Sequence, residues 1–432
     1  MAGPMALGII AIQAFNLVDI FFIGLLGTDA LAAISFTFPV TFLVISLAMG
    51  LGTGLSACVG QVLGKGNHTI AAQFTSHSLL LTVLFTGALS TAGALTIDPV
   101  FRLLGASDEL LLLLHDYMLI WYLTVPLLII PMVGNSAIRA TGDTKTPSIV
   151  MIVAGLVNGI LDPLLIFGLG PFPEWGIQGA AVASACSWLV ATIVGLWLLW
   201  RRERLLIWPL LVPDKLINQW RQLLAVAIPA SFTNLLNPIS TAILMAILAS
   251  LGTEVVAAYG AASRIEAILL IAIISLGSVL APFISQNTGA NQPQRSRHAL
   301  LTSMQFIMGF QFALFGLLWW LAPTLARIFT DSDEVAQHLV FYLRLVPLSY
   351  GLQGCFMLLA SALNGLRVSS ISLLFNSIRL FGILLPLVWL GNYWHGETGV
   401  FTGILLANMV AGSLAATFAW WSFPLKIKLP KR

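Results

Sequence analysis

The sequence predicts an all-α polytopic membrane protein with twelve transmembrane helices in two pseudo-symmetric six-helix lobes. Three observations predict this fold class: the composition, a series of apolar runs of membrane-spanning length, and a repeat that pairs the two halves of the chain. Of the 432 residues, 58% are hydrophobic and 9% are charged, whereas a soluble domain carries about 25% charged residues. The chain therefore cannot cover a globular surface with polar side chains.

The apolar runs are long enough to cross a hydrocarbon core of about 30 Å, which needs about 20 residues. Only helices and closed barrels satisfy the backbone in lipid. Runs such as SLLLTVLFTGALSTAGALTI lack the alternating polarity of barrel strands. We place six helical spans near 2–27, 30–51, 70–97, 111–140, 146–170 and 177–200, and six more near 222–250, 254–282, 299–328, 336–365, 369–391 and 398–422.

A polar segment, RRERLLIWPLLVPDKLINQWRQ, separates these two sets of spans and holds the densest basic cluster of the chain. We expect an amino-terminal six-helix lobe over residues 1–200, a cytoplasmic linker over 201–221 and a carboxyl-terminal six-helix lobe over 222–432.

The two lobes carry matching residues at a fixed spacing. A shift of 225 residues pairs GTDALAA from Gly27 with GTEVVAA from Gly252, and also Pro4 with Pro229, Gln61 with Gln286, Gly64 with Gly289, and SDE from Ser107 with SDE from Ser332. A shift of 223 pairs Gly142 with Gly365, and WGIQG from Trp175 with TGVFTG from Thr398. An even number of spans per half makes this a parallel repeat, which is an architecture of transporters.

The repeat also bears on the start of the chain. Pro229 follows the amphipathic stretch INQWRQLLAVAI, whereas only three residues precede Pro4. We expect that Met1 is not the natural start, or that the first helix lacks its leading turns.

Lysine and arginine gather in alternate loops, and this bias predicts the orientation. With the amino terminus inside, the outer loops hold only Arg102 and Arg327. The inner loops and the tail hold fifteen basic residues: Lys65, Arg139, Lys145, Arg201, Arg202, Arg204, Lys215, Arg221, Arg295, Arg297, Arg367, Lys426, Lys428, Lys431 and Arg432. The positive-inside rule therefore places both termini in the cytoplasm.

Four acids fall at membrane depth: Asp19, Asp162, Glu266 and, near an outer end beside His115, Asp116. A charge at the bilayer centre costs about 2.5–3.5 kcal/mol on insertion scales, so intramembrane acids are usually functional. The alternative for Asp19 is a carboxylate that a neighbouring helix satisfies, holding two spans together. For Asp116 we expect an interfacial position.

The surroundings of two of these acids indicate a cation or proton site. Asn158 and Asp162 are four residues apart and so share one helix face. Pro163 frees a backbone carbonyl one turn earlier. Gln13, Asn16 and Asp19 recur every three residues as a polar stripe. Oxygen groups without thiols or a histidine cluster suit a hard cation or a proton rather than zinc or copper.

Two carboxylates that lie close together in a low dielectric repel each other, so one of them would take up a proton near neutral pH or exchange it for a cation. The membrane potential supplies about 2.3 kcal/mol per charge per 100 mV. That energy can drive the export of a solute if titration changes the helix geometry.

Three further motifs accompany the two six-helix lobes: IRATGDTKTP at Ile138–Pro147, NGILDPLLIFG from Asn158, and the pair QVLGKGN and QNTGAN after the second and eighth spans. In these features, and over its whole length, the chain resembles the multidrug and toxic compound extrusion (MATE) transporters. The chain is most similar to the DinF-like and archaeal-type branch, because its seventh and tenth spans contain no acid. That resemblance implies a cation site made of Asp19, Asn158, Asp162 and Ser184, with serine where threonine is more usual.

Together these features predict a cation-coupled multidrug efflux antiporter rather than an enzyme, working by alternating access around a central cleft between the lobes. A proton or Na⁺ would enter the site, with a slight preference for the proton; for Na⁺, Asp19, Asn158 and Asp162 would be metal ligands. We expect small amphipathic or cationic drug-like substrates, a monomer in the cytoplasmic (inner) membrane, no cofactor and no nucleic acid.

Candidates for lining the substrate cleft are the polar stripe, its aromatic neighbours and two charged residues of the second lobe: Gln13, Asn16, Phe15, Phe38, Arg264 and Glu266. Ordinary packing is the alternative for the aromatic residues. Arg264 and Glu266 are two residues apart and point to different faces of their helix. Glu266 would then pair with Arg379 or Arg344, since buried charges are normally paired. GLGTGLSA at Gly50 predicts close helix packing.

Two other functions were weighed. A lipid-linked oligosaccharide flippase of related fold would need a basic cavity for pyrophosphate, and the first six spans offer no cation at mid-membrane. An integral membrane enzyme is the alternative from another class, but no His-Glu-x-x-His, Gly-x-Ser-x-Gly or clustered histidine motif is present.

Overall fold

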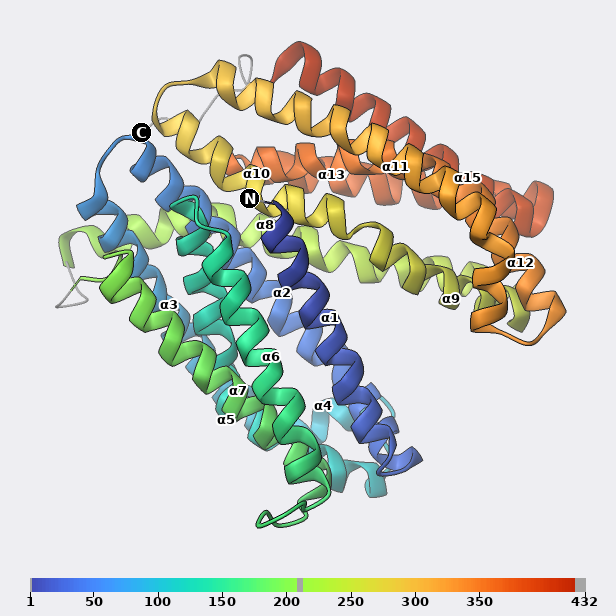
Figure 1. Ribbon diagram of the computed structural model, residues 1–432, viewed down its shortest axis with the longest axis horizontal. Coiled ribbons are helices and arrows are strands. Elements are labelled where there is room, and N and C mark those ends of the chain that lie inside the picture. Colours follow the sequence, from blue (N-terminus) through green and yellow to red (C-terminus); the bar gives the residue numbers. More distant parts are fainter. Residues whose placement is uncertain (1, 208–212, 424–432) are drawn as a thin grey trace. The chain divides into compact units, whose positions relative to one another are not determined.

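The computed structural model describes residues 2–207 and 213–423, and within those ranges the chain is helical with no β-strand (Figure 1). Met1, the central linker residues 208–212 and the basic tail residues Lys426, Lys428, Lys431 and Arg432 lie outside the described residues.

The chain divides into two compact units, Met1–Ser231 and Phe232–Arg432. The boundary falls inside helix α8 (Pro213–Ala249). Seven helices and a π-helical turn precede α8 in the first unit: α1 (Ala2–Gly24), α2 (Thr28–Gly64), α3 (His68–Leu95), α4 (Ile97–Leu103), α5 (Asp108–Ala140), α6 (Lys145–Ile166), α7 (Gly176–Trp197) and η1 (Leu198–Arg202). The second unit continues after α8 with α9 (Thr253–Leu269), α10 (Ile271–Gly289), α11 (Pro293–Phe329), α12 (Asp333–Leu345), the 3₁₀ turn η2 (Val346–Ser349), α13 (Tyr350–Gly365), α14 (Ser369–Ser377), the π-helical η3 (Ile378–Leu384) and α15 (Leu385–Ser422).

The twelve predicted spans are confirmed as helices, with three differences in how they are divided. The eighth span is interrupted at Leu270, between α9 and α10. The tenth span is interrupted by the 3₁₀ turn η2, between α12 and α13. The eleventh and twelfth spans follow one another without an intervening loop, because α15 bends at Gly396 (φ 56, ψ −131) and continues. By length and composition, eleven helical segments of the described ranges are able to cross a membrane, and the segment Ser369–Ser422 contains two of the predicted spans.

Helix α5 forms the centre of the first unit, where it packs against α2, α3 and α7, while α1 lies beside α6 and α6 packs on α7 (Figure 1). The apolar face of α5 is fully buried at Met118, Ile129 and Val133. In the second unit α13 has the corresponding central place, packed against α10, α11 and α15.

The glycine spacing of α2 confirms the predicted close helix packing. A Cβ atom at Gly50 would lie 2.6 Å from the backbone oxygen of Ala227, and one at Gly54 would lie 2.9 Å from that of Leu223. Both partners belong to the first turns of α8, within the first unit. Because only glycine leaves room there, the two backbones come into contact.

The repeat is visible in local backbone geometry. Gly27 and Gly252 each precede a helix with a positive φ, 116° and 136°. Ser107 and Ser332 each cap a helix by accepting a backbone N–H three residues later, at 3.4 Å in both cases. The 225-residue shift therefore relates equivalent turns and caps in the two units.

The 223-residue shift is wrong at Gly142. Gly142 (φ 100°) donates its N–H to the oxygen of Arg139, and Arg367 (φ 65°) donates its N–H to the oxygen of Asn364, both at 3.0 Å. Gly142 therefore corresponds to Arg367, at the usual shift of 225, and not to Gly365. The second unit keeps the left-handed backbone conformation at this turn but has arginine in place of glycine.

The pairing of Trp175 with Thr398 is also wrong. Gly176 opens α7 with φ 53°, and Gly396 opens the last part of α15 with φ 56°. These two glycines are 220 residues apart. The spacing is shorter here because a loop separates α6 from α7, whereas α15 bends sharply at the equivalent place.

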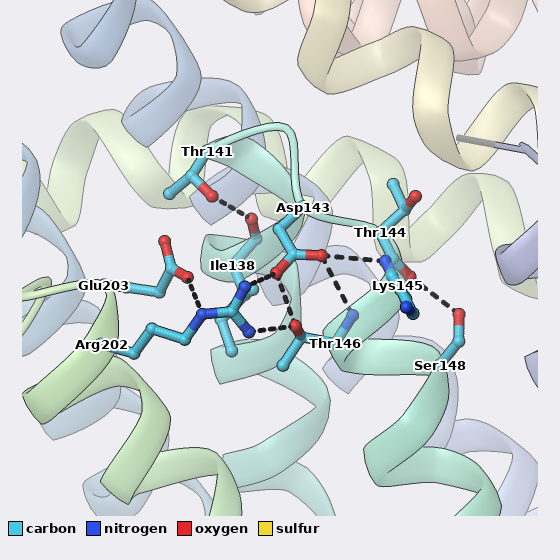
Figure 2. A network of polar contacts seen from close by, with 9 residues as sticks. All are labelled: Ile138, Thr141, Asp143, Thr144, Lys145, Thr146, Ser148, Arg202 and Glu203. Atoms are coloured by element: carbon cyan, nitrogen blue, oxygen red, sulfur yellow. Dashed lines mark hydrogen bonds and ion pairs between the residues drawn. The ribbon is translucent and has the colours of Figure 1, made fainter.

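The IRATGDTKTP segment joins the α5–α6 turn to the end of α7 (Figure 2). Asp143 accepts the backbone N–H groups of Lys145 and Thr146 at 2.9 and 3.0 Å and so caps α6. Its other oxygen, Oδ2, lies 2.9 Å from Nη2 of Arg202, and Arg202 also donates to the Thr146 hydroxyl. Partial burial alone would raise the pKa of Asp143, but these hydrogen bonds and the Arg202 charge outweigh it and leave the pKa lowered.

Gly50→Ala should destabilise the protein by about 1–3 kcal/mol, the range for overpacking a tight core. The Ser231 hydroxyl can move aside, but the Ala227 carbonyl belongs to a helix backbone. Thermal unfolding of the purified protein in detergent measures the change. Gly87→Ala is the matched control, since a Cβ there would meet no atom within 4 Å. Equal unfolding temperatures for the two variants would contradict the packing.

Asp143→Asn should lower the unfolding temperature at neutral pH by removing the charged cap of α6. Because the folded pKa of Asp143 is lowered, its contribution is present above the unfolded pKa of about 3.9 and is lost as pH falls through the folded value. The difference between the variant and the unsubstituted protein should therefore begin to shrink below about pH 4 and vanish only below the lowered folded pKa. A difference that persists unchanged in acid would show that the cap does not depend on the charge.

Candidate cation-coupling site

Asn158 and Asp162 lie on the face of α6 that is turned into the first unit. The Asn158 side-chain nitrogen donates to Oδ1 of Asp162 at 3.0 Å, as their spacing of four residues predicts. Asp162 has no exposed surface in the structure. The two side chains therefore form one buried polar unit among apolar neighbours.

Asp19 comes to this unit from α1, which runs parallel to α6. The Phe15 ring of α1 lies over Gly155 of α6, where a Cβ atom would be 1.9 Å from the ring. Two turns earlier on both helices, Gly8 lies against Ser148. Small residues on one helix opposite large ones on the other allow this close approach. One turn beyond Phe15, the Asp19 carboxyl is in hydrogen-bonding and electrostatic contact with that of Asp162.

The acid pair lacks hydrogen-bond donors. Oδ1 of Asp19 and Oδ2 of Asp162 are buried and accept no hydrogen bond from any donor of the described residues. No lysine or arginine is among the described groups that interact with either acid. Two carboxylates cannot hydrogen bond to each other, so a proton on one of them, or a bound cation, is what satisfies the pair.

Ser184 reaches the site from α7. The Asn158 side-chain nitrogen lies 3.5 Å from the Ser184 hydroxyl oxygen, so Asn158 bridges Asp162 and Ser184. The structure thus brings together all four residues of the predicted cation site, from α1, α6 and α7. No cluster of three or more histidine, cysteine or acidic side chains suited to a metal occurs in the described ranges. A sodium ion here would therefore depend on the amide and hydroxyl oxygens.

Tyr117 of α5 also belongs to the site, and the sequence analysis did not include it. It is buried and interacts electrostatically with both Asp19 and Asp162. The neighbouring Asp116 is exposed, as expected for an interfacial position. The signal that could have identified Tyr117 is its pairing with Tyr342 at a shift of 225, ten residues after each SDE cap.

The predicted polar stripe of α1 does not face the acid pair as a whole. Asp19 faces α6, but Gln13 and Asn16 are exposed. Three residues turn a helix by about 300°, so a stripe of that period drifts around the axis by about 60° at each step. Phe15 packs on α6 and so supports the packing alternative, whereas Phe38 is exposed and stacks on Phe42 at 6.0 Å.

In the second unit Glu266 of α9 accepts hydrogen bonds from the Tyr342 hydroxyl at 3.1 Å and from the Gln353 amide at 3.5 Å. Of its two predicted partners, Arg379 is the one that interacts with it electrostatically. Arg344 instead donates to the Trp319 carbonyl at 3.3 Å and lies 4.8 Å over that indole ring.

Neutral groups connect Arg379 to Glu266. Arg379 donates to Oδ1 of Asn408 at 3.3 Å, and Asn408 donates to the side-chain oxygen of Gln353, also at 3.3 Å. The Arg379 guanidinium lies 5.1 Å from the centre of the Phe356 ring. This network contains one acid and one base, whereas the first unit's site contains two acids and no base.

A family model described as MatE matches the chain twice, over residues 4–164 and 229–390. The matched segments begin at Pro4 and Pro229, which are the paired prolines of the 225-residue repeat. The chain belongs to the MatE family of transporters. Membership of a transporter family excludes the membrane-enzyme alternative.

Among its relatives, a FAD transporter of Shewanella oneidensis is 45% identical over 95% of this chain and 91% of its own length. The probable multidrug resistance protein YoeA of Bacillus subtilis is 26% identical over 93% of this chain and 88% of its own. Relatives of this MatE protein therefore include one described as a probable multidrug resistance protein and one described as a FAD transporter.

Solved structures share the fold of this MatE protein. The Vibrio cholerae MATE transporter VcmN in its bent form superposes with a TM-score of 0.92 and 31% identity, covering 97% of this chain and 95% of that one. An outward-facing multidrug resistance MATE family transporter gives a TM-score of 0.90 with 25% identity, covering 97% and 94%. The predicted two-lobed helical fold is confirmed.

Asp162→Asn should raise the unfolding temperature at about pH 8, because an amide both removes like-charge repulsion and supplies a donor to Asp19. We expect a gain of about 1–3 kcal/mol, the range for satisfying a buried polar group. Thermal unfolding in detergent measures it, with the exposed Asp116→Asn as control. If the variant were no more stable than the unsubstituted protein at about pH 8, repulsion between Asp19 and Asp162 would be contradicted.

Proposed function

We propose that this MatE protein is a secondary antiporter that exchanges H⁺ or Na⁺ for an amphipathic aromatic compound by alternating access. The observation that carries the proposal is the buried contact between Asp19 and Asp162, to which the described residues supply no neighbouring cation and too few hydrogen-bond donors. A pair arranged only for stability would include a base, as the Glu266 network of the second unit does.

The acid pair is suited to coupling because it lies at the contact between two helices. With a proton, the Asp19 and Asp162 carboxyls attract each other across the α1–α6 contact; without it, they repel. A ligand shifts a conformational equilibrium by its differential affinity for the two states. A pH difference of one unit supplies about 1.4 kcal/mol, and about 2.3 kcal/mol comes from each charge that crosses 100 mV.

The geometry supports a proton as the coupling ion. The two carboxyl groups are already in contact, so one proton completes the hydrogen bond between them. The Ser184 hydroxyl is connected to Asp162 only through Asn158. Five or six converging oxygens, which a hard cation of this size prefers, would require rearrangement of Asn158 and Ser184.

We place the protein in the cytoplasmic membrane as a monomer with both termini inside and with no cofactor. Lys145 and Arg202 lie at the end of the first unit where α6 begins and α7 ends. Arg102, in the last turn of α4, pairs at 2.9 Å with Asp108, the first residue of α5, at the opposite end of the unit. This separation supports the orientation that the positive-inside rule predicts.

For the substrate, the relatives favour a flavin-type aromatic compound over a broad set of drugs. The Shewanella oneidensis FAD transporter is 45% identical to this chain, whereas the Bacillus subtilis multidrug resistance protein is 26% identical. Cationic drug-like compounds are the second candidate, supported by the drug-exporter relatives.

Asp19→Asn should abolish gradient-driven export while leaving substrate binding intact. Proteoliposomes containing the purified protein are loaded with substrate and given either a pH gradient or a sodium gradient. We expect the gradient-driven flux of the variant to be lower by about tenfold or more, because a pH difference of one unit corresponds to a tenfold ratio of proton concentrations. Asp116→Asn serves as the matched control. Undiminished export by Asp19→Asn under both gradients would remove Asp19 from the coupling role.

A further inference from the structure

Arg264 of α9 is a charged residue at membrane depth without a compensating partner. It lies eleven residues after Thr253, where α9 begins, which corresponds to about 16 Å along a helix or half of the hydrocarbon thickness. Its side chain is exposed, and it takes part in no hydrogen bond, ion pair or ring contact with any residue of the described ranges.

Glu266 does not neutralise Arg264, although only one residue separates them. Residues that are two positions apart on a helix are separated by about 200° around its axis and so face opposite ways. The Glu266 carboxylate is turned into the second unit, where it accepts from Tyr342 and Gln353 and interacts with Arg379. The charge of Arg264 is therefore available on the outer face of α9.

Arg344 is an exposed arginine whose charge is compensated by contacts within the protein. Arg344 also lies eleven residues after the start of its helix, α12. Its guanidinium donates to the Trp319 carbonyl and lies over the Trp319 ring. Arg264 has neither a carbonyl nor an aromatic ring of this kind among the described residues.

The face of α9 that carries Arg264 exposes mostly small side chains. Around Arg264 these are Ala257, Gly260, Ala261 and Ala267, all exposed or partly exposed, and the one large apolar neighbour on that face is Ile268, one turn later. A Cβ atom at Gly260, one turn before Arg264, would meet nothing within 4 Å. By contrast, α11 exposes large apolar side chains: Phe306, Phe310, Phe312, Trp319 and Trp320. Since an unpaired arginine in lipid costs several kcal/mol, this face of α9 suits an aqueous path with room for a ligand.

Resting on the export function proposed above, we propose that Arg264 recognises an anionic group of the substrate, and that the substrate class is aromatic compounds bearing phosphate. A guanidinium presents a planar set of donors that matches phosphate oxygens in pairs. It also repels cations in a low dielectric. Arg264 thereby selects against the cationic drugs expected from the family resemblance and in favour of a dinucleotide such as FAD.

The test compares three ligands that share one ring system and differ in phosphate: riboflavin with none, FMN with one, and FAD with a pyrophosphate. Binding of each to the purified protein in detergent is followed by flavin fluorescence. Arg264→Gln should weaken FAD binding by about tenfold or more, as expected for a charged hydrogen-bonded contact. It should leave riboflavin binding unchanged. Arg264→Lys should fall between the two, because it keeps the charge but not the paired donors.

Arg344→Gln is the matched control at the same depth of the same unit and should leave all three affinities unchanged. Unfolding temperatures of all variants verify that they are folded. Equal losses of riboflavin and FAD binding in Arg264→Gln, no loss of either, or no FAD binding by the unsubstituted protein would each overturn the proposal.

Two further measurements separate this proposal from the coupling function. Asp19→Asn should keep the unsubstituted protein's ratio of FAD affinity to riboflavin affinity, because the coupling acid does not touch the substrate phosphate, whereas Arg264→Gln should lower this ratio. Arg264→Gln should still export an uncharged dye under a pH or sodium gradient. Loss of dye export in Asp19→Asn alone supports both proposals, whereas a lowered FAD-to-riboflavin ratio in Asp19→Asn and not in Arg264→Gln overturns the role of Arg264.

Discussion

The arrangement of the first unit depends on one constraint: two carboxyl groups are buried in contact with each other and share too few donors. Asp162 receives one amide hydrogen bond from Asn158, and one oxygen of each acid has no donor among the described residues. Such a contact is unfavourable unless it is protonated or holds a cation. The glycines of α6 keep the contact in place by allowing Phe15 and α1 to approach. A local conflict that the surrounding packing preserves is typical of a functional site.

The two units show how a duplicated scaffold can be given opposite electrostatic properties. Tyr117 and Tyr342 occupy equivalent positions at the 225-residue shift, and each lies beside an intramembrane acid. In the first unit the acid has a second acid for a neighbour. In the second unit the acid interacts with Arg379 through the amides of Asn408 and Gln353. The first arrangement suits the proposed uptake of a proton or cation, whereas the second keeps a balanced charge and connects α9, α13 and α15.

Much of the fold and part of the candidate site could be predicted from the sequence, because the sequence signals for them are local. Asn158 and Asp162 are one helical turn apart, so helix geometry alone brings them together. Asp19 and Tyr117 reach the site through tertiary packing. Asp19 was predicted to be functional because it is an acid at membrane depth, whereas its place in one site with Asn158, Asp162 and Ser184 was implied by the family resemblance. Glycine identity misled the alignment of the repeat at Gly142, because Arg367 adopts the left-handed conformation that usually favours glycine. Gln13 and Asn16 were assigned to the same stripe as Asp19 although a period of three is not that of a helix.

Charge also connects the substrate with the energetics of transport. When a cation moves inward and a cationic drug moves outward, the membrane potential assists the first step and opposes the second. When the exported compound is an anion, an inside-negative potential assists both steps, by about 2.3 kcal/mol for each charge per 100 mV. A single coupling site such as the Asp19–Asp162 pair is then sufficient for a steep gradient. Among the described residues, Arg264 on α9 has no partner and the acid pair on α1 and α6 has no base. These two features are consistent with one another in the proposed cycle, because the proposed substrate and the proposed coupling ion carry opposite charges.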